Sequence, residues 1–273
     1  MLHEGMKIEM GKNKRNNDVA NMKIEIKLII TVLVVIFIFF SRYIELNNTE
    51  VPENIANRVS QTNIINNEKI EKEKIPSYSG QIVININNDK PYFEDSDMTT
   101  ENFEIYSELD ELDRGQVAFA NICKYTMPPE GTKRGNISYK PSGWVQYLYG
   151  KNNSEHLYER CHLIAWQLGN ENNNKRNLIT GTSQMNAAMI EYENQVAKWI
   201  KQKNGQNKEY HVLYRVTPIY EGSNKVATGV EMEAKSVEEE GISFNKFIYN
   251  VQDGFEINYA TGEAKLIKNN KED

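Results

Sequence analysis

Residues 158–200 read YERCHLIAWQLGNENNNKRNLITGTSQMNAAMIEYENQVAKWI. Within this stretch, residues 184–203 lack glycine and proline and are rich in helix formers, and Ser183 just before them is a suitable helix cap. The pattern predicts one continuous helix. Asn186 and Glu193 are seven residues apart, which is nearly two turns at ~3.6 residues per turn, so both side chains leave the same helix face.

Short apolar runs precede the predicted helix. Residues 163–168 predict a buried strand that His162 begins, and residues 178–180 predict a second strand after a polar loop over 169–177. The order is therefore strand, loop, strand, helix. Outside this core, further strands are expected over 82–86, 212–216, 226–231, 243–250 and 255–258. The chain is thus predicted to be an α+β protein with a central, mostly antiparallel or mixed sheet.

The residue types in this core suggest hydrolysis of phosphodiesters. A histidine titrates near neutral pH and takes a proton from water, so His162 is a candidate general base. Asn186 and Glu193 offer oxygen ligands to a hard divalent cation, which polarises a phosphate. Arg160 is a candidate phosphate contact.

The same residues resemble the DNA/RNA non-specific endonucleases of the ββα-metal (His-Me finger) superfamily, in particular its bacterial secreted and competence branch. The family signature Asp-Arg-Gly-His stands here as Glu159-Arg160-Cys161-His162, with two departures. The similarity extends over roughly residues 80–265, including the KPSGW run at 140–144 and the LYRVTP run at 213–218.

The resemblance implies a role for each matched residue. His162 is the general base, Arg160 assists at the phosphate, Asn186 binds the metal directly and Glu193 binds it through water. The implied cofactor is Mg²⁺, or Mn²⁺ in its place. The implied activity is sugar-non-specific cleavage of DNA, and of RNA as a second substrate.

The sequence also allows two other interpretations. A catalytically inactive relative of these nucleases would bind nucleic acid without magnesium and without cleaving it. A cell-surface interaction module would bind a protein partner instead of nucleic acid. Taken singly, His162 also fits an ordinary core histidine, and Asn186 and Glu193 also fit a solvated helix face. The combination of His162, Asn186 and Glu193 favours the nuclease.

Residues 28–40 (LIITVLVVIFIFF) carry no charge and are flanked by Lys27 and Arg42. Their length lies between that of a signal-peptide apolar region and that of a full membrane span, and no small-residue cleavage site follows. We therefore expect a cytoplasmic tail over 1–27 and a signal anchor over 28–44, with a buried core helix as the alternative. An Asn-rich, mixed-charge tether over 45–80 follows, then a nuclease domain over 81–268 and a tail over 269–273. This order predicts a single-pass membrane protein with an extracellular domain, or a secreted protein if the anchor is cleaved.

The cysteines and the remaining histidines give weaker signals. Cys123 and Cys161 are the two cysteines of the chain, and they form either a disulfide in an oxidising exterior or two buried thiols. Structural roles are expected for His3, His156 and His211, which lie outside the motif.

The charge of the chain argues against a broad nucleic-acid-binding surface. Residues 81–273 contain 21 Lys and Arg against 28 Asp and Glu, a formal net charge of −7. Polyanions usually meet basic surfaces. Local positive potential is therefore expected from Lys175 and Arg176 beside the motif, with residues 133–134 and Lys124 as further candidates. No groove-reading helix is evident, so binding without base readout is expected.

Overall fold

The structure is a computed structural model that describes residues 75–203 and 208–267. The expected tail at 1–27, anchor at 28–44 and tail at 269–273 lie outside the described residues, as does the tether up to residue 74. Within the described part of the chain, no helix has the length and apolar character needed to cross a membrane.

A six-stranded sheet forms the centre of the domain, and every neighbouring pair in it is antiparallel. The sheet-rich α+β class is thereby confirmed. In spatial order the strands are β1 (Val83–Asn85), β10 (Ser243–Tyr249), β9 (Gly229–Ser236), β8 (Val212–Ile219), β3 (Ala118–Ile122) and β2 (Glu104–Tyr106).

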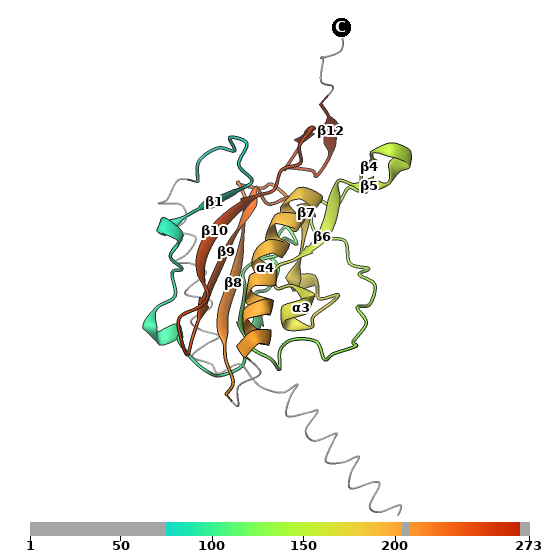
Figure 1. Ribbon diagram of the computed structural model, residues 1–273. Coiled ribbons are helices and arrows are strands. Elements are labelled where there is room, and N and C mark those ends of the chain that lie inside the picture. Colours follow the sequence, from blue (N-terminus) through green and yellow to red (C-terminus); the bar gives the residue numbers. More distant parts are fainter. Residues whose placement is uncertain (1–74, 204–207, 268–273) are drawn as a thin grey trace, which may run out of the picture. The chain divides into compact units, whose positions relative to one another are not determined.

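One long helix, α4 (Ser183–Lys203), packs against a face of this sheet (Figure 1). Its buried side chains recur every three or four residues, which is the spacing of one helix face. They join side chains of the central strands in one apolar cluster that includes Met185, Met189, Val196 and Ile200. Each such buried side chain contributes roughly 1.5–3 kcal/mol of transfer free energy.

A hairpin and a short helix precede α4 in the chain. The hairpin pairs β6 (Tyr158–His162) with β7 (Leu178–Thr182), and the short helix α3 (Trp166–Gly169) lies in the connection between them. In Figure 1 these elements lie beside α4, so the predicted ββα order is present in space as well as in sequence.

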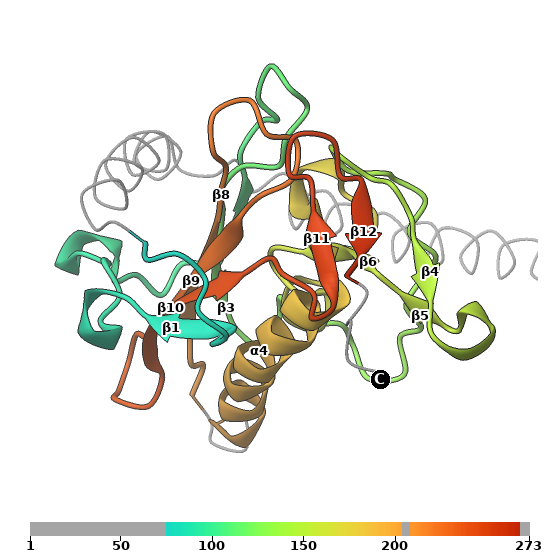
Figure 2. The same cartoon turned by 90° about the horizontal axis from the view of Figure 1, so that it is seen from above.

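The remaining elements are short. Two further hairpins pair β4 (Leu148–Tyr149) with β5 (Glu155–His156) and β11 (Phe255–Ile257) with β12 (Ala264–Leu266). Single 3-10 turns cover Asn87–Asp89, Asp95–Asp97, Lys151–Asn153 and Lys175–Asn177. Phe255 packs on Leu157 and Tyr158, which ties the β11–β12 hairpin to the start of β6 (Figure 2).

Two local predictions are wrong. His162 ends strand β6 and does not begin a strand, because the apolar run after it forms a bend and the helix α3. A short buried apolar run has no periodicity that distinguishes a strand from a bend followed by a short helix.

The second wrong prediction is the helix cap at Ser183. The cap of α4 is Thr182, whose hydroxyl accepts a hydrogen bond from the amide of Met185 at 3.0 Å, whereas the Ser183 hydroxyl donates to the carbonyl of His156.

The other sheet strands fall close to their predicted positions. Strands at 178–180, 212–216, 243–250 and 255–258 match β7, β8, β10 and β11 with small shifts at their ends. The strand expected over 226–231 begins later, at Gly229, and extends to Ser236.

Candidate active site

Strand β6, helices α3 and α4, and the irregular segment between β3 and β4 enclose a pocket of about 300 Å³. Four residues singled out in the sequence, Arg160, His162, Asn186 and Glu193, line this one pocket. Its full lining is Arg134, Ile137, Glu159, Arg160, His162, Ala165, Trp166, Gln167, Asn186, Ile190 and Glu193.

The last three residues of strand β6 alternate between the pocket and the core, and Glu159 before them also lines the pocket. Side chains two residues apart leave a strand on the same face, so Arg160 and His162 line the pocket together. Cys161, between them, is fully buried in the apolar core. There it lies against Gly181, where an added Cβ would collide with the Cys161 sulfur. The side chain that replaces the signature glycine is therefore accommodated by a glycine on the partner strand.

The two ring nitrogens of His162 have different partners. Nε2 lies 2.9 Å from the backbone carbonyl oxygen of Asn172, and Nδ1 lies 3.1 Å from a terminal guanidinium nitrogen of Arg134. A carbonyl only accepts and a guanidinium only donates. His162 is therefore the neutral tautomer with its proton on Nε2 and its lone pair on Nδ1.

Burial keeps this imidazole neutral. Removal from water lowers the pKa of His162 to about 4; the hydrogen bond to Asn172 opposes this shift and the charge of Arg134 adds to it. At neutral pH the ring is therefore unprotonated at Nδ1, where it accepts the hydrogen bond from Arg134.

The lowered pKa of His162 predicts a loss of stability in acid. Unfolded histidine has a pKa of about 6.5, so between that pH and about 4 the unfolded chain binds a proton that the folded chain does not. Stability then falls as the pH falls through this window, by about 2 kcal/mol at pH ~4.5. Denaturant unfolding of the wild type and of His162→Gln at neutral pH and at pH ~4.5 measures this. The variant is expected to lose less stability, and equal losses would contradict the assignment.

Helix α4 presents Asn186 and Glu193 to the pocket from the same face, as their spacing predicts. Glu193 is buried, and removal from water raises the pKa of its carboxyl to about 7, while a hydrogen bond with Gln167 and the charge of Arg134 oppose the rise. Glu191, two residues earlier, is exposed. A bound cation would stabilise the ionised form of Glu193, which burial disfavours.

Arg160 is held firmly at the pocket edge. Its Nε donates a hydrogen bond of 2.8 Å to the carbonyl of Tyr139, and its guanidinium carbon lies 4.4 Å from the centre of the Trp144 ring. Both partners come from the segment between β3 and β4. The terminal nitrogens of Arg160 carry further N–H donors for an anion.

The cations of the pocket differ from those expected beside the motif. Lys175 and Arg176 do not line it; Arg176 is paired with Glu108 at 2.6 Å, and Lys175 lines a separate depression with Lys140. Arg134, a secondary candidate in the sequence, is the second arginine of the pocket. The Asn172 carbonyl escaped prediction because a backbone group leaves no trace in residue type.

Of the two alternatives for the cysteines, the structure shows two buried thiols and no disulfide between Cys123 and Cys161. Cys123 and Cys161 are both free and buried. The Cys123 sulfur lies beside Asn102 and the amide of Tyr125, whereas Cys161 points into the core beneath β7. These are different surroundings, so the cysteines do not brace the motif.

Comparison with known proteins agrees with this geometry. Residues 91–238 match the DNA/RNA non-specific endonuclease family. A deoxyribonuclease from Streptococcus dysgalactiae subsp. equisimilis is 33% identical over 138 residues, and the match covers 49% of this chain but only 42% of that protein's length.

Solved structures share the fold. NucA from Streptococcus agalactiae, with no metal bound, matches with a TM-score of 0.60 at 25% identity over 71% of this chain and 91% of its own. The magnesium-bound form of NucA gives a TM-score of 0.61 at 24% identity over 74% of this chain and 95% of its own. Sda1 nuclease with bound zinc gives 0.51 at 26% identity over 60% of this chain and 79% of its own. With the family match extending over more than half of its residues, the chain belongs to the DNA/RNA non-specific endonuclease family.

Proposed function

We propose that this protein is a metal-dependent endonuclease that hydrolyses phosphodiester bonds of DNA, and also of RNA, without reading sequence. One observation carries the proposal: a neutral histidine, whose lone pair on Nδ1 accepts a hydrogen bond from Arg134, lines a pocket that also holds two candidate oxygen ligands and two arginines. Family membership and the nuclease relatives support the same reaction class.

His162 is the general base in this proposal. Arg134, which donates to Nδ1 in this structure, turns to the phosphate when substrate binds. Nδ1 then takes a proton from water while the water oxygen bonds to phosphorus and the bond from phosphorus to the 3′ oxygen breaks. The Asn172 carbonyl holds the proton on Nε2 and so fixes which nitrogen acts. Arg160 and Arg134 bind the phosphate oxygens, since both guanidinium groups line the pocket.

The residues of the pocket fit a hard cation. Asn186 and Glu193 provide a carboxamide and a carboxylate oxygen, and no cysteine lines the pocket among the described residues. Oxygen ligands of this kind suit Mg²⁺ and Mn²⁺. When bound, such an ion supplies positive charge that polarises the phosphate and stabilises the leaving oxygen.

Local charge offsets the acidic character of the domain. Besides the two arginines, Lys124 and Lys201 line a neighbouring depression that shares Trp166 and Gln167 with the pocket. A short basic track of this kind attracts a phosphate backbone while most of the surface repels it. Binding is therefore expected to be weak and sensitive to salt.

Arg134→Ala tests the second arginine. Because a charge-assisted hydrogen bond is worth about 1.5–3 kcal/mol, loss of a phosphate contact is expected to lower kcat/KM about 10- to 100-fold. Lys133→Ala, at the exposed neighbouring position, is the matched control and is expected to retain activity. If Arg134 only blocks Nδ1 of His162 through its hydrogen bond, its removal would instead raise turnover. That result would contradict the proposed role of Arg134 in binding the phosphate.

A cleavage assay tests the function as a whole. The purified protein is incubated with plasmid DNA and with RNA, in magnesium and in EDTA. Cutting in magnesium that stops in EDTA and returns when magnesium is restored is the expected result. A folded protein that binds DNA but cuts neither substrate under any metal would indicate a silent binding module, and one that binds no nucleic acid would indicate a protein-interaction module.

We also propose that residues 28–44 form a signal anchor and that the nuclease domain, residues 81–268, lies outside the cell. The support is the uncharged run with basic flanks in the sequence. Addition of protease to intact cells is expected to digest the domain, and protection of the domain would contradict the proposed orientation.

A further inference from the structure

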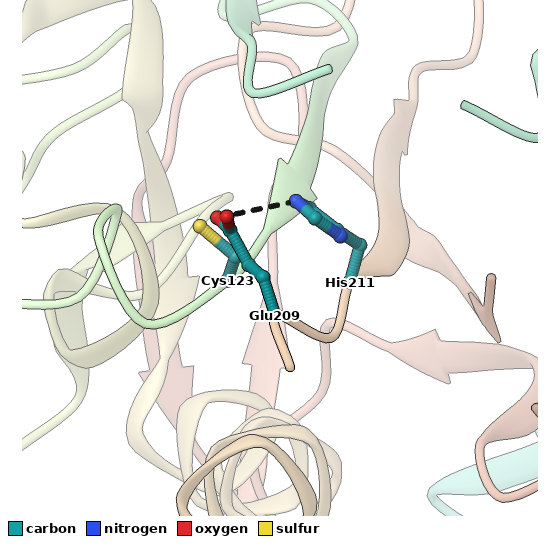
Figure 3. A group of neighbouring side chains, drawn as sticks. All are labelled: Cys123, Glu209 and His211. Atoms are coloured by element: carbon teal, nitrogen blue, oxygen red, sulfur yellow. Dashed lines mark ion pairs between the residues drawn. The ribbon is translucent and has the colours of Figure 1, made fainter. Parts of the chain in front are cut away.

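A second group of metal-ligating side chains lies outside the candidate active site. Cys123 directly follows strand β3, and Glu209 and His211 directly precede strand β8. One ligand atom from each residue lies within 4.8 Å of the other two, and Figure 3 shows the side chains pointing toward one another. None of the three lines the active-site pocket.

The orientation of His211 is fixed by a carboxylate behind it. Nδ1 lies 2.5 Å from one oxygen of Glu238, and the other oxygen of Glu238 accepts from the His211 amide at 2.8 Å. With Nδ1 turned to this carboxylate, Nε2 is the nitrogen that faces the cluster, 3.4 Å from Glu209 and 3.1 Å from Oδ1 of Asn102. Both of these oxygens only accept, so Nε2 donates to them when no metal is present, and a bound cation would take the place of that proton. A carboxylate that binds the other ring nitrogen in this way is a usual outer support of a metal-binding histidine.

A fourth ligand atom meets the same point. The Oδ1 atom of Asn102 lies 3.1 Å from the sulfur of Cys123 and 3.1 Å from Nε2 of His211. Tetrahedral zinc, with bonds of ~2.0–2.3 Å, separates its ligand atoms by roughly 3.2–3.8 Å. The two distances from Asn102 are just below that range, and the 3.4 Å between His211 and Glu209 falls within it. The ligand atoms of Cys123, Glu209 and His211 all lie within 4.8 Å of one another.

We propose that Cys123, Glu209 and His211, together with the Asn102 side-chain oxygen, form a structural zinc site separate from the catalytic pocket. Sulfur with imidazole selects a borderline-soft ion, and four converging protein ligands leave no open position for chemistry. The amide of Tyr125 donates a hydrogen bond of 3.3 Å to the sulfur, which helps to orient it. The partial exposure of Glu209 gives the ion a route in.

The position of the site indicates what zinc would hold together. It joins the end of β3 to the segment that enters β8. Thr126, three residues after Cys123, donates a hydrogen bond to the Leu168 carbonyl in α3 at 2.8 Å. Zinc would therefore fix the beginning of the segment that carries Arg134 and Tyr139 to the active-site pocket.

Cobalt substitution in the full-length chain tests the site. Co²⁺ bound to a thiolate gives a charge-transfer absorption in the near ultraviolet, and Co²⁺ bound only to oxygen and nitrogen does not. The chain stripped with chelator is expected to show this absorption at one Co²⁺ per chain and to lose it when Zn²⁺ is added. Cys123→Ser is expected to remove the absorption, and Cys161→Ser, which changes the other buried thiol, is expected to keep it.

Glu209→Gln replaces one proposed zinc ligand at a partly exposed position, where a substitution disturbs folding least. Its zinc affinity is expected to fall tenfold or more, while Glu240→Gln, at an exposed neighbouring position, retains it. Absence of the thiolate absorption in the folded wild type, or its persistence in Cys123→Ser, would overturn the site. That result would leave the magnesium-dependent cleavage assay untouched, because the pocket contains no cysteine among its described lining residues.

Discussion

Replacing His162 with alanine is expected to lower kcat for DNA cleavage about 10³-fold, which corresponds to roughly 4 kcal/mol of transition-state stabilisation. The reason is positional: His162 lines the pocket, Nδ1 carries the lone pair of its ring beside Arg134, and burial keeps this nitrogen unprotonated at neutral pH. Single-turnover cleavage of plasmid DNA in saturating magnesium measures the change. DNA binding is expected to change little, since Arg134 and Arg160 remain.

The matched control is His156→Ala, which removes an exposed imidazole from β5 outside the pocket. It is expected to cleave at the wild-type rate. Circular dichroism of both variants separates loss of the base from loss of folding, because His162 is buried and its removal leaves Asn172 without that partner. A folded His162→Ala protein with full activity would show that another group takes the proton.

Removing either of the two proposed oxygen ligands on α4 is expected to raise the magnesium concentration needed for half-maximal cleavage by tenfold or more. Asn186→Ala deletes the carboxamide, and Glu193→Gln keeps the shape of the side chain while removing its charge. Both changes weaken binding of a hard cation, which takes oxygen ligands and gains from a negative one. Magnesium titration of the cleavage rate measures the shift.

Glu191→Gln is the control on the same helix, since it removes one carboxylate at an exposed position outside the pocket. Its magnesium response is expected to match the wild type. If Glu193→Gln and Glu191→Gln respond alike, the carboxylate of Glu193 does not take part in metal binding. If Asn186→Ala loses activity with an unchanged magnesium titration, its role lies in positioning the substrate.

Regular elements could be predicted wherever a local period was sustained. Helix α4 runs for 21 residues with apolar positions every three or four, so both its extent and the shared face of Asn186 and Glu193 followed from the period of an α-helix. The run after His162 is only a few residues long. Burial alone did not separate a strand from the bend and short helix that form there, because both bury the same side chains.

The sequence by itself determined the family, the helix and the residues Arg160, His162, Asn186 and Glu193, because their spacing along regular elements fixes their directions. Tertiary structure alone decided which groups meet them. Arg134 reaches Nδ1 of His162 from the irregular segment after β3, and the Asn172 carbonyl selects the tautomer. The convergence of Cys123 with His211 likewise depends on the pairing of β3 with β8. No local period encodes such contacts, since they join segments that only the folded sheet brings together.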